Sequence, residues 1–138
     1  MRLYVDSSAL VKRYVDEPDS DAYVAALAGA GSLATARHTI IEAARAISRS
    51  LEPADAGRML DQLDADWAHL EVCELDATTC ALAREMALES GARTLDALHL
   101  AAMWRMGGDE TRLLTADERQ ARAARQLGLP VAQTSSLA

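Results

Sequence analysis

Leu3-Tyr-Val-Asp6-Ser-Ser-Ala-Leu-Val11 opens the chain with a short apolar run that stops at a carboxylate. The first three residues of this stretch are strand formers, as in a buried strand of a sheet. The residues from Ala9 to Tyr14 are compatible with a helix. The stretch therefore predicts a buried strand followed by a helix, with Asp6 at the junction.

Asp6 has two interpretations at this position. Aspartate is a preferred N-cap residue, so its carboxylate can simply cap the helix that follows. Ligands of open α/β sheets, however, bind outside the carboxyl ends of the strands, so Asp6 can also be a metal ligand at a catalytic edge. This stretch alone leaves both interpretations open.

Length and composition place the chain among ordinary globular proteins. It has 138 residues, of which 50% are hydrophobic and 25% charged, and we expect residues 1–138 to form a single domain. No apolar run approaches the roughly 18 residues of a membrane span. The chain begins with a strand pattern rather than a signal peptide. Cys73 and Cys80 fit no metal-binding spacing, so we expect buried, reduced thiols in a cytoplasmic protein.

The net charge of −7 argues at first against a nucleic-acid partner, because phosphate binding usually requires a basic surface. Two details weaken that argument. All basic residues except Lys12 are arginines, which bind phosphates in a bidentate manner. A cluster of acids that holds metal ions would also add to the negative net charge, and the net charge would then not represent the charge of the binding surface.

Helical and strand patterns alternate along the whole chain, which is typical of an α/β fold with a short, mostly parallel central sheet flanked by helices. Thr35, Asp76 and Thr94 are candidate helix caps, and Gly91 is a candidate helix end. Helices are predicted over residues 9–14, 21–28, 36–50, 54–68, 77–90, 95–106 and 118–127, and strands over residues 3–5, 32–35, 70–75, 111–115 and 129–131.

Three further acids are candidates for the edge at which Asp6 lies. Asp117 follows a second strand pattern, and parallel strands place their carboxyl ends on one edge. Asp96 lies in the first turn of the most apolar helix, where it either compensates the helix dipole or binds a metal. Glu42 lies three residues before Arg45, and a solvated ion pair explains it equally well.

If the four acids meet, their mutual repulsion requires cations. Two like charges ~4 Å apart repel by about 4 kcal/mol at an effective dielectric constant near 20. Ligand sets made only of oxygen select hard ions such as Mg²⁺ or Mn²⁺, which support phosphodiester hydrolysis. Ser8 and Thr115 would then hydrogen-bond to the carboxylates or to bound water, or would act as ordinary cap and turn hydroxyls.

Four segments together resemble the PIN-domain ribonucleases, and more narrowly the VapC-type toxins of bacterial type II toxin–antitoxin pairs. They occur in the order of that family and span nearly the whole chain. The segments are Leu3 to Val11, Ile40-Ile-Glu-Ala-Ala-Arg45, Thr94-Leu-Asp96-Ala-Leu-His-Leu-Ala-Ala102 and Leu113-Leu-Thr-Ala-Asp117-Glu-Arg119.

The resemblance implies a three-layer PIN-like fold and a Mg²⁺-dependent endoribonuclease, with Mn²⁺ as a substitute ion. It carries the acidic quartet of the family onto Asp6, Glu42, Asp96 and Asp117, and it thereby selects Glu42, which periodicity alone does not. It also implies an RNA substrate, a small antitoxin that blocks the acidic groove, a homodimer and a cytoplasmic location. The alternative is a catalytically silent PIN-like module that binds RNA or antitoxin.

Two rival classes fit the residues less well. An aspartyl phosphatase requires a second aspartate two residues after the first, and that position is Ser8. A receiver-type phosphoacceptor domain requires a lysine at the end of a late strand, and Lys12 is early.

Basic residues near the predicted edge are candidates for contacts with RNA phosphates or for ordinary surface charges. His99 is interpreted as a core histidine rather than a general base, because metal-bound water needs no imidazole. His38 and His69 are expected at the surface. The candidate RNA-binding arginines are Arg37, Arg45, Arg93 and Arg112.

Overall fold

The computed structural model describes residues 1–107 and 110–133. Along the chain the elements are β1 (Arg2–Val5), α1 (Ser7–Leu10), the 3₁₀ helix η1 (Val11–Arg13), α2 (Ser20–Gly29), β2 (Ser32–Ala36), α3 (Thr39–Ser50), α4 (Pro53–Trp67), β3 (Glu71–Cys73), α5 (Ala77–Ser90), α6 (Thr94–Arg105), β4 (Thr111–Leu114) and α7 (Glu118–Gln126).

The strands in the described part of the chain form one parallel sheet in the order β3-β2-β1-β4. Tyr4 of β1 is aligned with Ala34 of β2 on one side and with Leu113 of β4 on the other. The first strand is therefore an inner strand, and the carboxyl ends of its neighbours lie beside its own. This arrangement confirms the predicted α/β class with a parallel central sheet.

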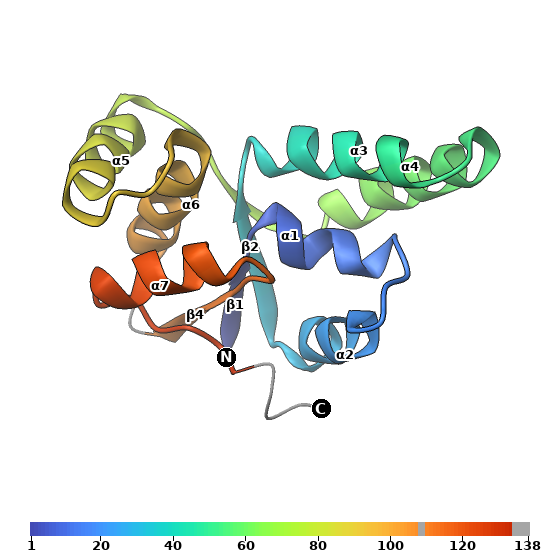
Figure 1. The fold of residues 1–138 in the computed structure, drawn as a ribbon, viewed down its shortest axis with the longest axis horizontal. Helices are drawn as coiled ribbons and strands as arrows, with labels where there is room; N and C mark the ends of the chain where they lie inside the picture. The colour runs from blue at the N-terminus through green and yellow to red at the C-terminus, as the bar shows by residue number, and fades with distance from the viewer. Residues whose placement is uncertain (108–109, 134–138) are drawn as a thin grey trace.

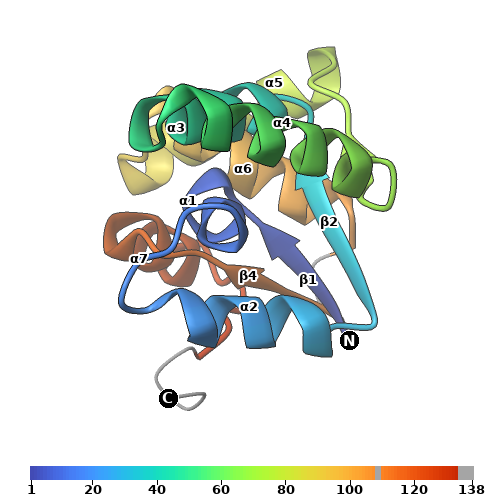
Figure 2. The same cartoon turned by 90° about the vertical axis from the view of Figure 1, so that its right-hand side faces the viewer.

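Helices cover both faces of the sheet, as Figure 1 shows with the sheet nearly edge-on. Helices α5, α6 and α7 lie on one side, and α1 to α4 lie on the other, where Figure 2 views them in front of the strands. Tyr4 belongs to the core on the α6 side, whereas Leu3 and Val5 belong to the core on the α1 side. A strand buried on both faces has no place for a solvated side chain, which explains its unbroken apolar sequence.

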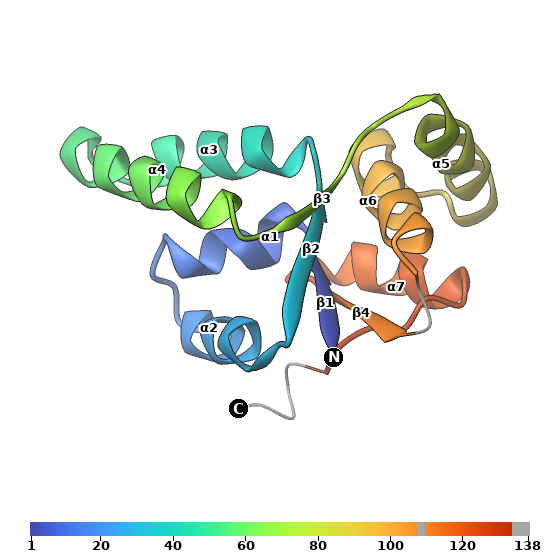
Figure 3. The ribbon, with the colours of Figure 1, turned by 180° about the vertical axis from the view of Figure 1, so that it is seen from behind.

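Among the described helices, α6 has the largest number of buried residues, as its apolar composition predicts. It packs against α5 and β2, and Figure 3 shows it between α5 and the sheet. Leu100 and Met103 are fully buried in the core on this side. The helix places its first turn, with Asp96, near the carboxyl end of β2, since the Nε2–H of His38 donates to the Leu95 carbonyl over 3.2 Å.

Two of the predicted helix limits are confirmed, because local sequence determines them. The Asp76 carboxylate caps α5 by accepting a hydrogen bond from the backbone N–H of Thr79 over 2.8 Å. Gly91 ends the same helix in the left-handed conformation, with φ of 75°. A residue with a Cβ atom is strained there, so glycine is the natural choice.

Other helix limits differ from the prediction because tertiary contacts decide them. Helix α3 begins at Thr39 rather than at residue 36, and Thr35 lies in β2. The Thr35 hydroxyl donates to the Val5 carbonyl over 2.7 Å instead of capping the helix. Arg93, not Thr94, occupies the N-cap of α6. The predicted strand over residues 129–131 is reduced to a single bridge between Leu113 and Val131.

Two remaining expectations concern the thiols and the membrane. Cys73 and Cys80 are free, but Cys73 is only partly buried and Cys80 is exposed, so the expectation of buried thiols is wrong. Within residues 1–107 and 110–133, every helix is too short or too polar to cross a bilayer.

Candidate metal centre

Asp6 lies at the carboxyl end of β1, where it is 4% exposed. Its Oδ1 accepts hydrogen bonds from the backbone N–H of Ala9 over 3.1 Å and from the Ser8 hydroxyl over 2.7 Å. The first of these bonds is the predicted N-cap of α1. Burial raises the pKa of Asp6 above its ordinary value of 3.8, although nearby donors oppose the shift.

The hydroxyl groups of Ser8 and Thr115 connect the end of β1 to the turn after β4. Thr115 donates to Asp6 Oδ2, and its Oγ1 accepts from the backbone N–H of Asp117 over 3.1 Å. Ser8 Oγ accepts from the backbone N–H of Ala116 over 2.9 Å. Both hydroxyls thus fix the Asp6 carboxylate and the start of α7 relative to each other.

Three aspartates from different elements interact at this edge. Asp117 caps α7 by accepting from the backbone N–H of Arg119 over 2.9 Å, and Asp96 lies in the first turn of α6. Burial raises the pKa of Asp96, and the charges of Asp117 and Asp6 raise it further. We call Asp6, Asp96 and Asp117 the aspartate group, since each adds negative charge to the same region.

Glu42 projects from the first turn of α3 and is bound to a histidine rather than to the aspartate group. His99 Nε2 lies 2.7 Å from Glu42 Oε1, and His99 Nδ1 lies 2.7 Å from the Tyr4 hydroxyl. A carboxylate only accepts, so the Nε2–H of His99 donates to Glu42, while Nδ1 is hydrogen-bonded to the Tyr4 hydroxyl. His99 is 1% exposed with both ring nitrogens bonded, as expected for a core histidine.

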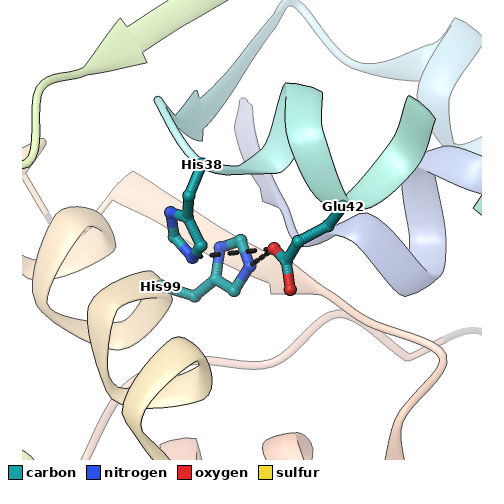
Figure 4. A group of neighbouring side chains, drawn as sticks. All are labelled: His38, Glu42 and His99. Atoms are coloured by element: carbon teal, nitrogen blue, oxygen red, sulfur yellow. Dashed lines mark hydrogen bonds and ion pairs between the residues drawn. The ribbon is translucent and has the colours of Figure 1, made fainter. Parts of the chain in front are cut away.

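His38 completes this side of the site, shown in Figure 4. Its Nε2 lies 3.6 Å from Glu42 Oε1, and its ring centroid lies 4.1 Å from that of His99. His38 is only 7% exposed, so the expectation of a surface residue is wrong. The turn between β2 and α3 directs it towards α6, and periodicity carries no information on such a turn. His69 is exposed as expected.

The histidines and Glu42 form a compact set of ligand atoms. Among the described residues, His38, Glu42 and His99 each offer one candidate ligand atom, and these atoms all lie within 4.8 Å of one another. We call these three residues the glutamate group. Burial by itself would raise the pKa of Glu42, but its interactions with His99 and His38 outweigh burial and lower the pKa below 4.5.

The structure therefore divides the predicted acidic quartet into two parts. The aspartate group is held mainly by hydroxyl and backbone N–H donors, and burial keeps the pKa of Asp6 and of Asp96 raised although the charge of His99 opposes the shift. Glu42 is instead hydrogen-bonded to His99, and its pKa is lowered. Carboxylate and hydroxyl oxygens are the ligands that hard divalent cations prefer, so the aspartate group suits Mg²⁺ or Mn²⁺. Asp6 is already oriented by its donors, and a carboxylate offers about four acceptor positions, which leaves room for a cation.

The candidate RNA-binding arginines occupy different regions. Arg93 is the N-cap residue of α6 and lines a cavity together with Asp96. Arg37 forms an exposed ion pair with Glu74, in which Nε lies 2.9 Å from Oε1. Arg45 is exposed on α3. Arg112 lines another cavity, with Met1 and other residues at the amino ends of the strands, so the structure does not bring it to the aspartate group.

Comparison with known proteins places the chain in one family. The PIN domain family matches residues 3–126. Ribonuclease VapC46 of Mycobacterium tuberculosis is 38% identical over 132 residues, which cover 94% of this chain and 95% of that protein.

Solved structures share the fold at lower identity. The crystal structure of VapC20 from Mycobacterium tuberculosis, described as a sarcin-ricin loop cleaving toxin, has a TM-score of 0.72 and 16% identity, and the match covers 88% of this chain and 94% of that one. A toxin-antitoxin complex from Klebsiella pneumoniae has a TM-score of 0.71 and 11% identity, covering 96% and 97%. With a PIN-domain match over residues 3–126 and a VapC ribonuclease 38% identical over nearly its whole length, the chain belongs to the PIN-domain family and, within it, to the VapC-type ribonucleases.

Proposed function

We propose that this chain is a Mg²⁺-dependent endoribonuclease, the toxin of a toxin–antitoxin pair, with Asp6, Asp96, Asp117 and Glu42 as its catalytic and metal-binding residues. The observation that carries the proposal is the accumulation of three carboxyl groups where β1, the turn after β4 and the first turn of α6 meet, so that the charges of Asp117 and Asp6 raise the pKa of Asp96. A divalent cation relieves this repulsion, and Mn²⁺ would substitute for Mg²⁺.

The side chains of this chain have distinct tasks in the proposed reaction. Ser8 and Thr115 hold the Asp6 carboxylate in one orientation through the hydrogen bonds already described. His99 holds Glu42, and the first turn of α6 presents Asp96. When bound, the cation lowers the pKa of water and stabilises the charge that develops on the phosphodiester.

The proposed partners follow from the relatives. VapC46 is named a ribonuclease, VapC20 is described as cleaving the sarcin-ricin loop, and the Klebsiella protein was solved as a toxin-antitoxin complex. We infer an RNA substrate, a small antitoxin protein and a cytoplasmic location. We also infer a homodimer from the resemblance, and light scattering after size-exclusion chromatography tests it; the mass of a single chain would contradict it.

The decisive experiment separates chemistry from helix capping. Asp6 and Asp76 both cap a helix by accepting from the N–H three residues later, and asparagine caps equally well. We expect Asp6→Asn to abolish Mg²⁺-dependent cleavage of RNA, and Asp76→Asn to retain it. Folding of both variants is checked by circular dichroism, and chelation of the metal should stop cleavage by the unsubstituted protein.

The same experiment tests the alternative of a catalytically silent module. Such a module would bind RNA or antitoxin without producing new RNA ends in any of these samples. Full cleavage by Asp6→Asn would contradict the assignment of the aspartate group. Mapping of RNA ends after induction in a bacterial host identifies the substrate, because discrete cuts in one RNA reveal both the molecule and the bond.

A further inference from the structure

A cavity of about 370 Å³ lies beside the aspartate group, between the turn that joins α5 to α6 and helix α7. Asp96 forms part of its wall, so an occupant of this cavity lies next to the proposed cleavage site. The catalytic proposal assigns no role to the other residues of the wall.

The charge of this wall is opposite to that of the chain as a whole. Its charged residues are Arg93, Arg119, Arg122 and Asp96, whereas the whole chain has a net charge of −7. In the described part of the chain, the side chains of Arg93 and Arg122 form no hydrogen bond or ion pair, and Arg93 interacts with the protein through its longer-range attraction to Asp96. The Nε of Arg119 lies 3.9 Å from Asp117 Oδ1. The cavity therefore presents guanidinium donors that the protein itself leaves available for an anion.

Gln120, which lies in the same wall, has a buried acceptor atom without a hydrogen-bond partner among the described residues. It is 1% exposed, and its Nε2 donates to the Asp96 carbonyl over 3.1 Å. A carbonyl only accepts, so the orientation of the amide is fixed by this bond. Its Oε1 is buried and lacks a hydrogen-bond donor among the described residues. A buried acceptor without a donor destabilises the protein, so this position favours a ligand that brings a donor.

We propose that this cavity binds a nucleotide of the RNA strand adjacent to the bond that is cut. The phosphate lies against Arg93 and Arg122, and a ribose hydroxyl or a base amino group donates to Gln120 Oε1. A nucleotide carries both groups, and a continuous strand that reaches the aspartate group passes the wall containing Asp96. The inference rests on the proposed function and extends it to substrate binding.

Arg122 and Arg125 provide a matched test, because both are exposed arginines on α7 but only Arg122 lines this cavity. Arg125 lies instead 3.5 Å from Glu118. The affinity of a fluorescein-labelled, single-stranded RNA is measured by fluorescence anisotropy with EDTA present, over a range of salt concentrations. Binding is thus measured without cleavage.

We expect Arg122→Ala to weaken RNA binding about tenfold, as for the loss of one charge-assisted hydrogen bond. The slope of log K against log salt should fall by about 0.7, the value for one phosphate contact on a single strand. Arg125→Ala should leave affinity and slope near those of the unsubstituted protein. Arg122→Lys should restore the slope but not the full affinity, because lysine lacks the bidentate fork.

Gln120→Met tests the second contact, since methionine retains the length of the side chain but cannot accept the proposed bond. The Gln120→Met variant should have a smaller ratio of RNA affinity to DNA affinity, measured with the same base sequence, because DNA lacks the 2′-hydroxyl. Circular dichroism checks its fold, and the arginine variants test the cavity independently of Gln120.

Four results would overturn the inference. Equal weakening by Arg122→Ala and Arg125→Ala would indicate a general electrostatic attraction rather than a site. Unchanged RNA affinity of Arg122→Ala, with weakened binding of a polyglutamate peptide, would indicate a site for an acidic protein segment. Absence of RNA binding by the unsubstituted protein would exclude both the subsite and an RNA substrate. If Asp6→Asn loses cleavage while Arg122→Ala binds RNA normally, the subsite fails and the proposed function stands.

Discussion

The aspartate group and the glutamate group lie at the same end of the sheet, but the pKa values of their carboxyl groups shift in opposite directions. Burial raises the pKa of Asp6 and of Asp96, and the charges of Asp117 and Asp6 raise the pKa of Asp96 further. Glu42 faces two histidines that lower its pKa. The comparison indicates that the requirement for a cation is concentrated on the aspartates, and that Glu42 is oriented by the protein itself.

The largest expected difference between the groups is in catalysis. Asp117→Asn should lower kcat/KM for RNA cleavage by roughly 10³-fold, about 4 kcal/mol, because it removes one of the three carboxylates of the proposed metal site. Glu42→Gln should lower it by roughly tenfold to a hundredfold, because the amide oxygen can still accept from His99. Steady-state kinetics in Mg²⁺ measure both, and equal losses would contradict the division into two groups.

The second prediction concerns the bond from His99 to Glu42. His99→Leu removes that donor and leaves the buried Tyr4 hydroxyl without its partner, so the free energy of unfolding should fall by about 1–3 kcal/mol. Cleavage should fall by roughly tenfold to a hundredfold, mainly in kcat, because Glu42 loses its orientation. Urea unfolding and steady-state kinetics measure the two effects.

Tyr4→Phe is the matched control for this prediction, since it removes only the hydroxyl and leaves the bond from His99 to Glu42. It should cost about 1 kcal/mol of stability and little activity. If Tyr4→Phe lost as much activity as His99→Leu, orientation of Glu42 would not be the function of His99.

The smallest predicted effect is on the pH dependence of stability without metal. A raised pKa means that the contribution of Asp96 is present below its ordinary pKa of 3.8 and is lost as pH rises through the folded value. A lowered pKa means that the contribution of Glu42 is present above 4.5 and is lost as pH falls through the folded value.

Thermal unfolding of two variants measures this difference. Relative to the unsubstituted protein, Asp96→Asn should gain stability as pH rises from the acid range to neutral. Glu42→Gln should lose relative stability over the same change. The opposite signs are the test, and a common sign would show that the histidines do not compensate Glu42.

The sequence predicts the parts of the fold that local chemistry determines. The apolar run before Asp6 predicts the buried strand, and Asp76 and Gly91 predict the limits of α5, because a cap and a left-handed glycine act on their own helix. The prediction that Thr35 caps a helix is wrong because a distant contact decides its position. Its hydroxyl binds the Val5 carbonyl, 30 positions away, and no local pattern reports that contact.

The same distinction applies to the site. Asp6 and Asp117 can be expected together because parallel strands end at one edge. Glu42 follows only from the family resemblance, because its partner His99 is 57 positions away. The burial of His38 depends on how the turn after β2 meets α6, and the cavity beside Gln120 depends on how α6 meets α7. These placements arise from tertiary packing rather than from periodicity.

The central position of β1 also determines when the site can exist during synthesis. The ribosome makes β1 first, but β1 is an inner strand, and its neighbour β4 is the last strand in chain order. Thr115 and Asp117, which follow β4, are therefore among the last parts of the site to be translated. A nascent chain, or a product truncated before β4, lacks both the second neighbour of β1 and one carboxylate of the aspartate group. The proposed activity thus requires translation of the chain past β4.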